Sequence, residues 1–199
     1  TNLADLGAEV IKIEHPKGDV VRGLGQGDNS LWWSVGARNK KLVGVDVKKP
    51  EGADIVRRLL ATADVFIENF RAGRVKEWGL DYDTLRKVNP GLVMLHVSGY
   101  GQTGPYSERP GVGTLAEAFS GYAHVTGEPD GPPTLPSFPL ADGVAALTGT
   151  YAVLAALWAR DRNGGIGDEI DISLYEPLLS MTGPMLINFT EGGVVSNRE

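Results

Sequence analysis

The sequence predicts an α/β fold built on a mainly parallel sheet. Short segments rich in Val and Ile alternate along the chain with segments of helical pattern, the order that gives parallel strands joined by crossover helices. With 199 residues and 42% hydrophobic content, the chain is long enough for one domain with a sizeable core. The sequence contains no internal repeat and no linker that would divide it into two domains.

Five segments have the composition of strands, and each is followed by a turn or a helix. They are residues 8–14, 42–47, 64–68, 92–97 and 169–174. Helices are predicted over 50–61, 73–78, 81–88, 113–120, 139–162 and 177–189, the last weakened by Gly183-Pro184. Ligands of open parallel sheets bind beyond the carboxyl ends of the strands. The residues just after the third strand are therefore candidate ligand contacts.

The longest predicted helix is dense in Ala and Leu, which are strong helix formers. Its large apolar residues recur at spacings of three and four, so they share one face. These residues are Val144, Leu147, Tyr151, Leu154 and Trp158. Asn163-Gly164-Gly165 ends the helix, and the small residues elsewhere on it predict burial on more than one side.

Asp142 stands where this helix begins, and two interpretations of it remain open. An Asp at a helix start commonly caps the first free backbone N–H groups. Because a helix start also stabilises an anion, the same carboxylate could be a covalent nucleophile toward an activated carbonyl, with Gly143 leaving room for an acyl group. Local chemistry does not decide between the two.

Composition excludes several classes of site. The chain has no cysteine, so disulfides, zinc–thiolate sites and Cys nucleophiles are absent, and a cytoplasmic location is expected. The net charge of -6 argues against nucleic acid or an anionic membrane as a partner. No signal peptide or membrane span is predicted, because the longest apolar run, 152–158, is short.

Familiar nucleotide and hydrolase motifs are also missing. There is no P-loop and no G-x-S-x-G elbow, and the glycines of 23–27 lie in a predicted loop away from any helix start. His15, His96 and His124 share no metal-ligand spacing, so no metal is expected. His96 is predicted to pack in the core, whereas His15, at a strand end, could equally line a ligand groove.

Basic residues concentrate in the first half of the chain, several of them just after predicted strands. They are Arg22, Arg38, Lys40, Lys41, Lys48, Arg71, Arg74 and Lys76. Most single charges belong to a solvated surface, but some of these side chains could together bind a phosphorylated small molecule.

Nine blocks, in order, resemble the family III coenzyme A transferases. They include ADLGAEVIKIEHP, DVKKPEG, ADVFIENFR, SGYGQTGPY, PLAD and IDISLYE. The resemblance implies a Rossmann-like, mainly parallel sheet with helices on both faces. It further implies that residues 1–199 are the N-terminal part of the large CoA-binding domain, that a small domain lies outside them, and that two chains interlock as a homodimer.

The resemblance also assigns roles. The family nucleophile falls on Asp142, and CoA contacts fall on His15, on Val45, Asp46, Val47 and Lys48, and on Asn69, Phe70 and Arg71. A further, usually basic, contact falls on Glu77, which leaves the neighbouring Lys76 as its substitute. The expected co-substrate is coenzyme A, and the expected substrates are an acyl-CoA and a small carboxylic acid. The implied intermediate is an aspartyl-CoA thioester, with Gly99, Gly101 and Gly143 as candidate oxyanion donors.

Two alternatives are kept. The related α-methylacyl-CoA racemases share many of these blocks, but their catalytic His would fall near Val112, which cannot accept a proton. A non-catalytic module would bind CoA without using Asp142.

Overall fold

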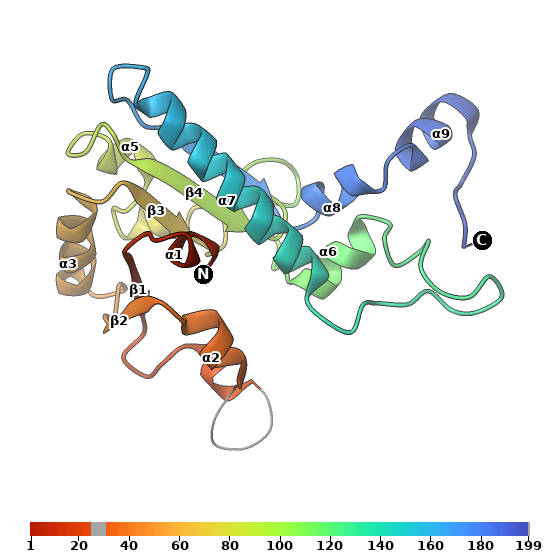
Figure 1. Ribbon diagram of the computed structural model, residues 1–199, viewed down its shortest axis with the longest axis horizontal. Helices are drawn as coiled ribbons and strands as arrows, with labels where there is room; N and C mark the ends of the chain where they lie inside the picture. The colour runs from red at the N-terminus through yellow and green to blue at the C-terminus, as the bar shows by residue number, and fades with distance from the viewer. Residues whose placement is uncertain (25–30, 199) are drawn as a thin grey trace.

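The computed structural model describes residues 1–24 and 31–198 (Figure 1). Gly25 and Gly27, which belong to the glycine-rich stretch discussed above, lie outside the described residues. The strands are β1 (Val10–Glu14), β2 (Lys40–Gly44), β3 (Val65–Glu68), β4 (Val93–Ser98) and β5 (Glu169–Ser173). The helices are α1 (Asn2–Asp5), η1 (Val20–Gly23), α2 (Leu31–Ala37), α3 (Pro50–Leu60), α4 (Arg74–Glu77), α5 (Tyr82–Leu85), α6 (Gly113–Phe119), α7 (Leu140–Arg160), α8 (Glu176–Met181) and α9 (Met185–Gly192).

Every strand pair in the described residues is parallel, which confirms the α/β prediction. The strands form two hydrogen-bonded sheets, β1–β2 and β3–β4–β5, rather than one. Composition identifies single strands, but which strands pair depends on where the backbone carries them. The register places Glu68 of β3 beside His96 of β4, and His96 beside Asp171 of β5.

Helices cover both faces of the three-stranded sheet. Successive residues of a strand point to opposite faces. Val93 and Leu95 of β4 accordingly join one buried cluster with residues of α7, whereas Leu92 and Met94 join another with residues of α3, α4 and α5. The expected two-sided arrangement is therefore confirmed.

Helix α7 packs on the sheet mainly through small residues. Its buried residues are Ala141, Val144, Ala145, Gly149 and Val153. A Cβ added to Gly149 would lie only 2.9 Å from Leu95 Cδ2, so the close approach requires glycine there. The stripe of large residues faces outward instead, since Leu147 and Trp158 are each 62% exposed. The sequence identified that stripe, but only its first member, Val144, packs in the core.

The prediction that no segment could span a membrane needs correction. α7 has 21 residues, and an 18-residue stretch of it has a mean hydropathy of 1.5, so it meets the length and composition criterion for a span. The apolar-run argument missed it because Thr, Gly and Tyr interrupt the run without making the helix polar. The same helix packs against β4 and β5 and carries Asp142 in its first turn, and 28% of that stretch is buried.

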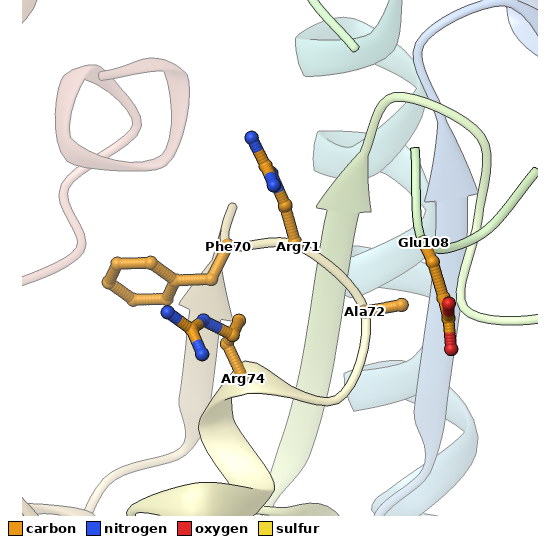
Figure 2. Close-up of a pocket in the computed structure, with 5 residues that line it drawn as sticks. All are labelled: Phe70, Arg71, Ala72, Arg74 and Glu108. Atoms are coloured by element: carbon orange, nitrogen blue, oxygen red, sulfur yellow. The ribbon is translucent and has the colours of Figure 1, made fainter. Parts of the chain in front are cut away.

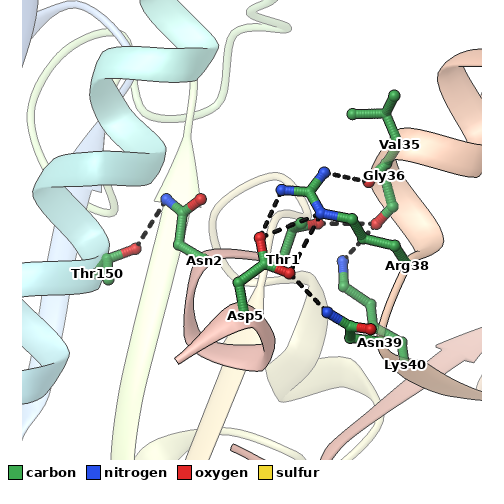
Figure 3. A network of polar contacts seen from close by, with 9 residues as sticks. All are labelled: Thr1, Asn2, Asp5, Val35, Gly36, Arg38, Asn39, Lys40 and Thr150. Atoms are coloured by element: carbon green, nitrogen blue, oxygen red, sulfur yellow. Dashed lines mark hydrogen bonds and ion pairs between the residues drawn. The ribbon is translucent and has the colours of Figure 1, made fainter. Parts of the chain in front are cut away.

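Helix α1 connects the two-stranded sheet to α7 (Figure 3). Asn2 Nδ2 donates to Thr150 Oγ1 of α7 at 3.3 Å. Asp5, at the other end of α1, accepts hydrogen bonds from Arg38 and from Asn39 Nδ2, just before β2. Asn39 has a φ of 60°, a left-handed conformation that Asn tolerates better than most residues.

Candidate active site

The candidate site lies beyond the carboxyl ends of β3 and β4, as parallel-sheet topology predicts. A cavity of about 430 Å³ is lined by Phe70, Arg71, Ala72, Arg74 and Glu108. Figure 2 shows Phe70, Arg71 and Ala72 on the segment after β3 and Arg74 at the start of α4, with Glu108, from the segment after β4, on the side of Ala72. The predicted contacts Phe70 and Arg71 therefore do line a cavity.

A smaller hollow of about 220 Å³ adjoins the first and shares Phe70 and Arg71 with it. Its other lining residues are Asn69, Ser98, Gly99, Ser107, Arg109, Pro110, Gly111 and Val112. Two glycines allow two backbone segments to approach closely here, because a Cβ on Gly99 would lie 2.5 Å from Gly111 Cα. This wall brings the end of β4 next to the residues that precede α6.

Asp142 lies beside this wall, although it is not itself a lining residue. Its carboxylate rests on Gly113, which follows Val112 of the hollow: a Cβ on Gly113 would stand only 2.0 Å from Asp142 Oδ2. Asp142 is the third residue of α7, and Pro139 occupies the cap position with no side-chain hydrogen bond. Asp142 therefore does not occupy the N-cap position, although its carboxylate accepts a hydrogen bond from its own backbone N–H in the first turn.

Two features of its surroundings make Asp142 more basic than an ordinary Asp. Asp142 is exposed as a residue, but partial removal of its carboxyl group from water raises the pKa of Asp142, and the negative charge of Glu117 raises it further. A hydrogen bond with its own backbone N–H acts in the opposite direction. Clefts in which burial and a like charge shift a pKa are frequent sites of catalysis.

The remaining predicted CoA contacts lie on other elements. His15 is exposed just after β1, and its Nδ1 accepts a hydrogen bond from the Lys17 backbone N–H at 3.1 Å. Residues 45–48 connect β2 to α3, where Val45 is buried, Asp46 and Val47 are partly buried, and Lys48 is exposed. Both groups stand at the carboxyl end of the two-stranded sheet, because Val45 N donates to Glu14 O.

Lys76 is exposed on α4 and does not line either cavity. Arg74 lines the larger cavity instead, and it pairs with Glu77 at 2.8 Å. Position 77, where the family resemblance leads us to expect a basic residue, is therefore a Glu that forms an ion pair with the neighbouring Arg74.

Two of the three proposed oxyanion donors are already engaged. The Gly101 N–H donates to Ser98 Oγ at 3.0 Å, and the Gly143 N–H donates to Pro139 O at 3.0 Å within α7. The sequence could not show this, because each bond depends on a local turn or helix that fixes the direction of the N–H. Gly99 remains a candidate, and it lines the smaller hollow.

Comparison with known proteins assigns the family. A family profile described as CoA-transferase family III matches residues 1–199. The chain belongs to CoA-transferase family III. It is 44% identical, over 98% of its length and 50% of the relative's, to succinyl-CoA–D-citramalate CoA-transferase of Chloroflexus aurantiacus. It is 36% identical, over 96% of its length and 44% of the relative's, to the human succinyl-CoA:glutarate CoA-transferase.

Solved structures agree with this assignment. A CAIB/BAIF family protein from Brucella suis matches with a TM-score of 0.92 and 35% identity, over 98% of this chain and 53% of that one. The Mycobacterium tuberculosis protein Rv3272 matches with a TM-score of 0.87 and 34% identity, over 94% of this chain and 53% of that one. The chain thus spans about half the length of the curated relatives it matches.

Sequence reasoning missed one basic residue of this candidate site. Arg109 lines the smaller hollow together with Arg71, and its guanidinium stacks on the Tyr106 ring at 3.9 Å. The only signal was an Arg-Pro-Gly sequence after the loop that follows β4. No group of three or more His, Asp or Glu side chains in residues 1–24 and 31–198 is arranged to hold a metal ion.

His96 is buried, as predicted, but it belongs to an ionic network. Its Nδ1 lies 2.5 Å from Glu68 Oε1, and its Nε2 lies 2.9 Å from Glu169 Oε1. Burial alone would lower the pKa of His96, but the two glutamates outweigh it, and the pKa is raised. Glu68 Oε2 also accepts the Phe70 backbone N–H at 2.7 Å, so the network supports the segment that lines both cavities.

Proposed function

We propose that this chain forms part of a CoA-transferase that moves coenzyme A from an acyl-CoA to a carboxylic acid through an aspartyl-CoA thioester on Asp142. The observation that carries this proposal is the position of the Asp142 carboxylate, seated on Gly113 beside the hollow that Arg71 and Arg109 line. The two guanidiniums suit the phosphates of CoA or the carboxylate of a substrate.

The reaction needs no external energy source. An Asp142 Oδ attacks the thioester carbonyl, and the C–S bond breaks to give a mixed anhydride and the CoA thiolate. The thiolate then attacks the aspartyl carbonyl, which releases the donor acid as its carboxylate and leaves aspartyl-CoA. The acceptor carboxylate attacks the aspartyl-CoA thioester, which gives a second mixed anhydride and the CoA thiolate. The thiolate then attacks the acceptor's carbonyl, which forms the new acyl-CoA and releases the Asp142 carboxylate. The thioester's energy is retained throughout.

Succinyl-CoA is the donor to test first. The names of the Chloroflexus relatives and of the mouse and human relatives specify succinyl-CoA, with D-citramalate, L-malate or glutarate as the second substrate. We therefore propose a dicarboxylic acyl-CoA as the donor and a small dicarboxylic acid as the acceptor.

The proposed assembly is an interlocked homodimer of the longer protein. It is supported by the outward apolar stripe of α7, which includes Leu147, Tyr151, Leu154 and Trp158, because exposed apolar surface of this kind marks contact with other protein. The remaining half of the longer chain, or its copy, would cover that stripe.

A racemase is the second candidate, and Val112 argues against it. Val112 lies in the wall beside Asp142, where that reaction needs a second group able to exchange a proton. We therefore expect the full-length protein, incubated with succinyl-CoA and a panel of dicarboxylic acids in deuterated water, to form new acyl-CoA species. A racemase would instead incorporate deuterium into a 2-methylacyl-CoA without any acceptor acid.

A further inference from the structure

Helix α6 presents two features to the first turn of α7, and Figure 1 shows the two helices side by side at this point. Gly113 and Glu117 are four residues apart on α6, so they lie on the same face of that helix. Gly113 receives the carboxylate of Asp142. One turn along, Glu117 Oε1 accepts the backbone N–H of Ala141 at 3.1 Å.

Glu117 supplies a cap that the sequence of α7 lacks. The first N–H groups of a helix have no partner within it, and Pro139 at the cap position makes no side-chain hydrogen bond. A carboxylate from another helix fills that role here, at the helix end that favours negative charge. Glu117 is only 3% exposed, so its place is fixed by the packing of α6 on α7.

The charges around this pair leave Glu117 as the dominant neighbour of Asp142. Within residues 1–24 and 31–198, no Lys, Arg or His forms an ion pair with either carboxylate. The other titratable side chains on elements packed against α7 have partners of their own. His96 of β4 lies between Glu68 and Glu169, and Glu176 of α8 accepts a hydrogen bond from Ser173 Oγ at 2.7 Å. Asp171 of β5 accepts the Gln102 backbone N–H, and Asp5 of α1 pairs with Arg38. The carboxylate of Glu117 therefore acts on Asp142 without a neutralising cation.

We propose that Glu117 is a positioning residue, which holds the first turn of α7 and places a second negative charge beside the nucleophile. This proposal rests on the proposed role of Asp142. Holding the turn keeps the Asp142 carboxylate over Gly113, at the wall of the hollow. The neighbouring charge makes that carboxylate a stronger base, and a more basic carboxylate is a more reactive nucleophile toward a thioester once it is ionised.

The test replaces Glu117 with Gln in the full-length protein. Gln keeps an oxygen that can accept the Ala141 N–H but removes the charge. The protonation of Asp142 is read directly from its modification by a water-soluble carbodiimide, which reacts with protonated carboxyl groups, by mass spectrometry of the peptide across a pH series. The pH profile of kcat/KM for CoA transfer gives an independent readout. Glu176→Gln, which removes a charge at the start of α8, is the matched control.

In Glu117→Gln, the midpoint of Asp142 modification and the acidic limb of kcat/KM should both move down by about one pH unit, the order expected for loss of a nearby like charge. The plateau of kcat should fall several-fold, and Glu117→Ala should lower it further because the cap is also lost. Glu176→Gln should leave the midpoint in place. If Glu117→Gln leaves the Asp142 midpoint where the wild type has it, the proposal is overturned.

The modification experiment separates this proposal from the proposed function, because it needs no turnover. A shifted midpoint in a protein that transfers no CoA would support the positioning role and reject the transferase. If Glu117→Ala does not fold, the comparison of wild type with Glu117→Gln still decides the outcome.

Discussion

Two clusters of acidic residues in this protein, each with one buried glutamate, have opposite electrostatics. At the start of α7, Glu117 is the charged neighbour of Asp142, no basic side chain in the described part of the chain pairs with either, and the pKa of Asp142 is raised. Across β3, β4 and β5, the glutamates 68 and 169 instead enclose His96, and the pKa of His96 is raised. In the first cluster like charges oppose each other, whereas in the second opposite charges are matched.

This difference indicates what each cluster contributes. A carboxylate kept beside a like charge is held in an unfavourable state, and groups in such surroundings are frequent at catalytic sites. A charge-matched network around a buried His stabilises one arrangement of the backbone, here the strand ends that carry residues 69–71. Changes in the first cluster should therefore alter chemistry, and changes in the second should alter stability and binding.

The largest effect is expected from Asp142→Asn. An amide is a poor nucleophile, so CoA transfer by the full-length protein should be abolished, while the circular dichroism spectrum and CoA binding stay as in the wild type. Transfer is measured by exchange of labelled CoA into the acyl-CoA pool. Substantial exchange in this variant would show that Asp142 is not the nucleophile.

Gly113→Ala should come next. The added Cβ would fall 2.0 Å from Asp142 Oδ2, so the carboxylate must move. A displacement of about 1 Å at a reacting group costs about a hundredfold in rate, and we expect a loss of kcat of that order. Gly36→Ala is the control, because a Cβ there meets nothing within 4 Å. Equal kcat values for the two variants would show that Gly113 does not seat the nucleophile.

His96→Gln should lower stability rather than chemistry. Loss of the cation between two glutamates should cost about 2 to 3 kcal/mol of unfolding free energy. Because the folded pKa of His96 is raised above 6.5, its stabilising contribution is complete below that pH and disappears as pH rises through the folded pKa. The difference in stability between wild type and variant, measured by urea unfolding, should therefore be larger in mildly acidic than in alkaline buffer. A gap that widens toward alkaline pH would contradict the assignment.

Arg71→Ala should have the smallest effect of the four. Arg71 lines both cavities on the segment that Glu68 supports, so its loss should weaken CoA binding by about tenfold, the cost of one charge-assisted hydrogen bond. Calorimetric titration with CoA measures this, and kcat should change little. Arg86→Ala, just after α5, is the control, since its guanidinium pairs at the surface with Asp83. Unchanged affinity in Arg71→Ala would place the CoA groove elsewhere.

Much of the fold follows from the sequence, because strand composition and the alternation with helices are local signals. The face by which α7 packs does not. Large residues at helical spacing mark a stripe, but Ala145, Gly149 and Val153 approach the sheet more closely, and contact with Leu95 decides the packing. Periodicity alone cannot rank two apolar stripes on one helix.

The same distinction holds for the candidate site, where local positions could be predicted and contacts between distant residues could not. Asn69, Phe70 and Arg71 could be placed at a strand end from the sequence, and the structure puts them in the walls of the hollows. The contacts of Asp142 could not, since Glu117 and Gly113 are 25 and 29 residues away and meet it only when α6 packs on α7. The pairing of His96 with Glu169 likewise depends on the register of strands far apart in the chain.

The most direct test of the account is to trap the intermediate. The full-length protein is incubated with succinyl-CoA and hydroxylamine, and its peptides are then analysed by mass spectrometry. Hydroxylamine converts an aspartyl-CoA thioester to a hydroxamate, so the account predicts a hydroxamate on Asp142 that forms only when acyl-CoA is present. A hydroxamate on another carboxylate, or turnover with Asp142 unmodified, would contradict it.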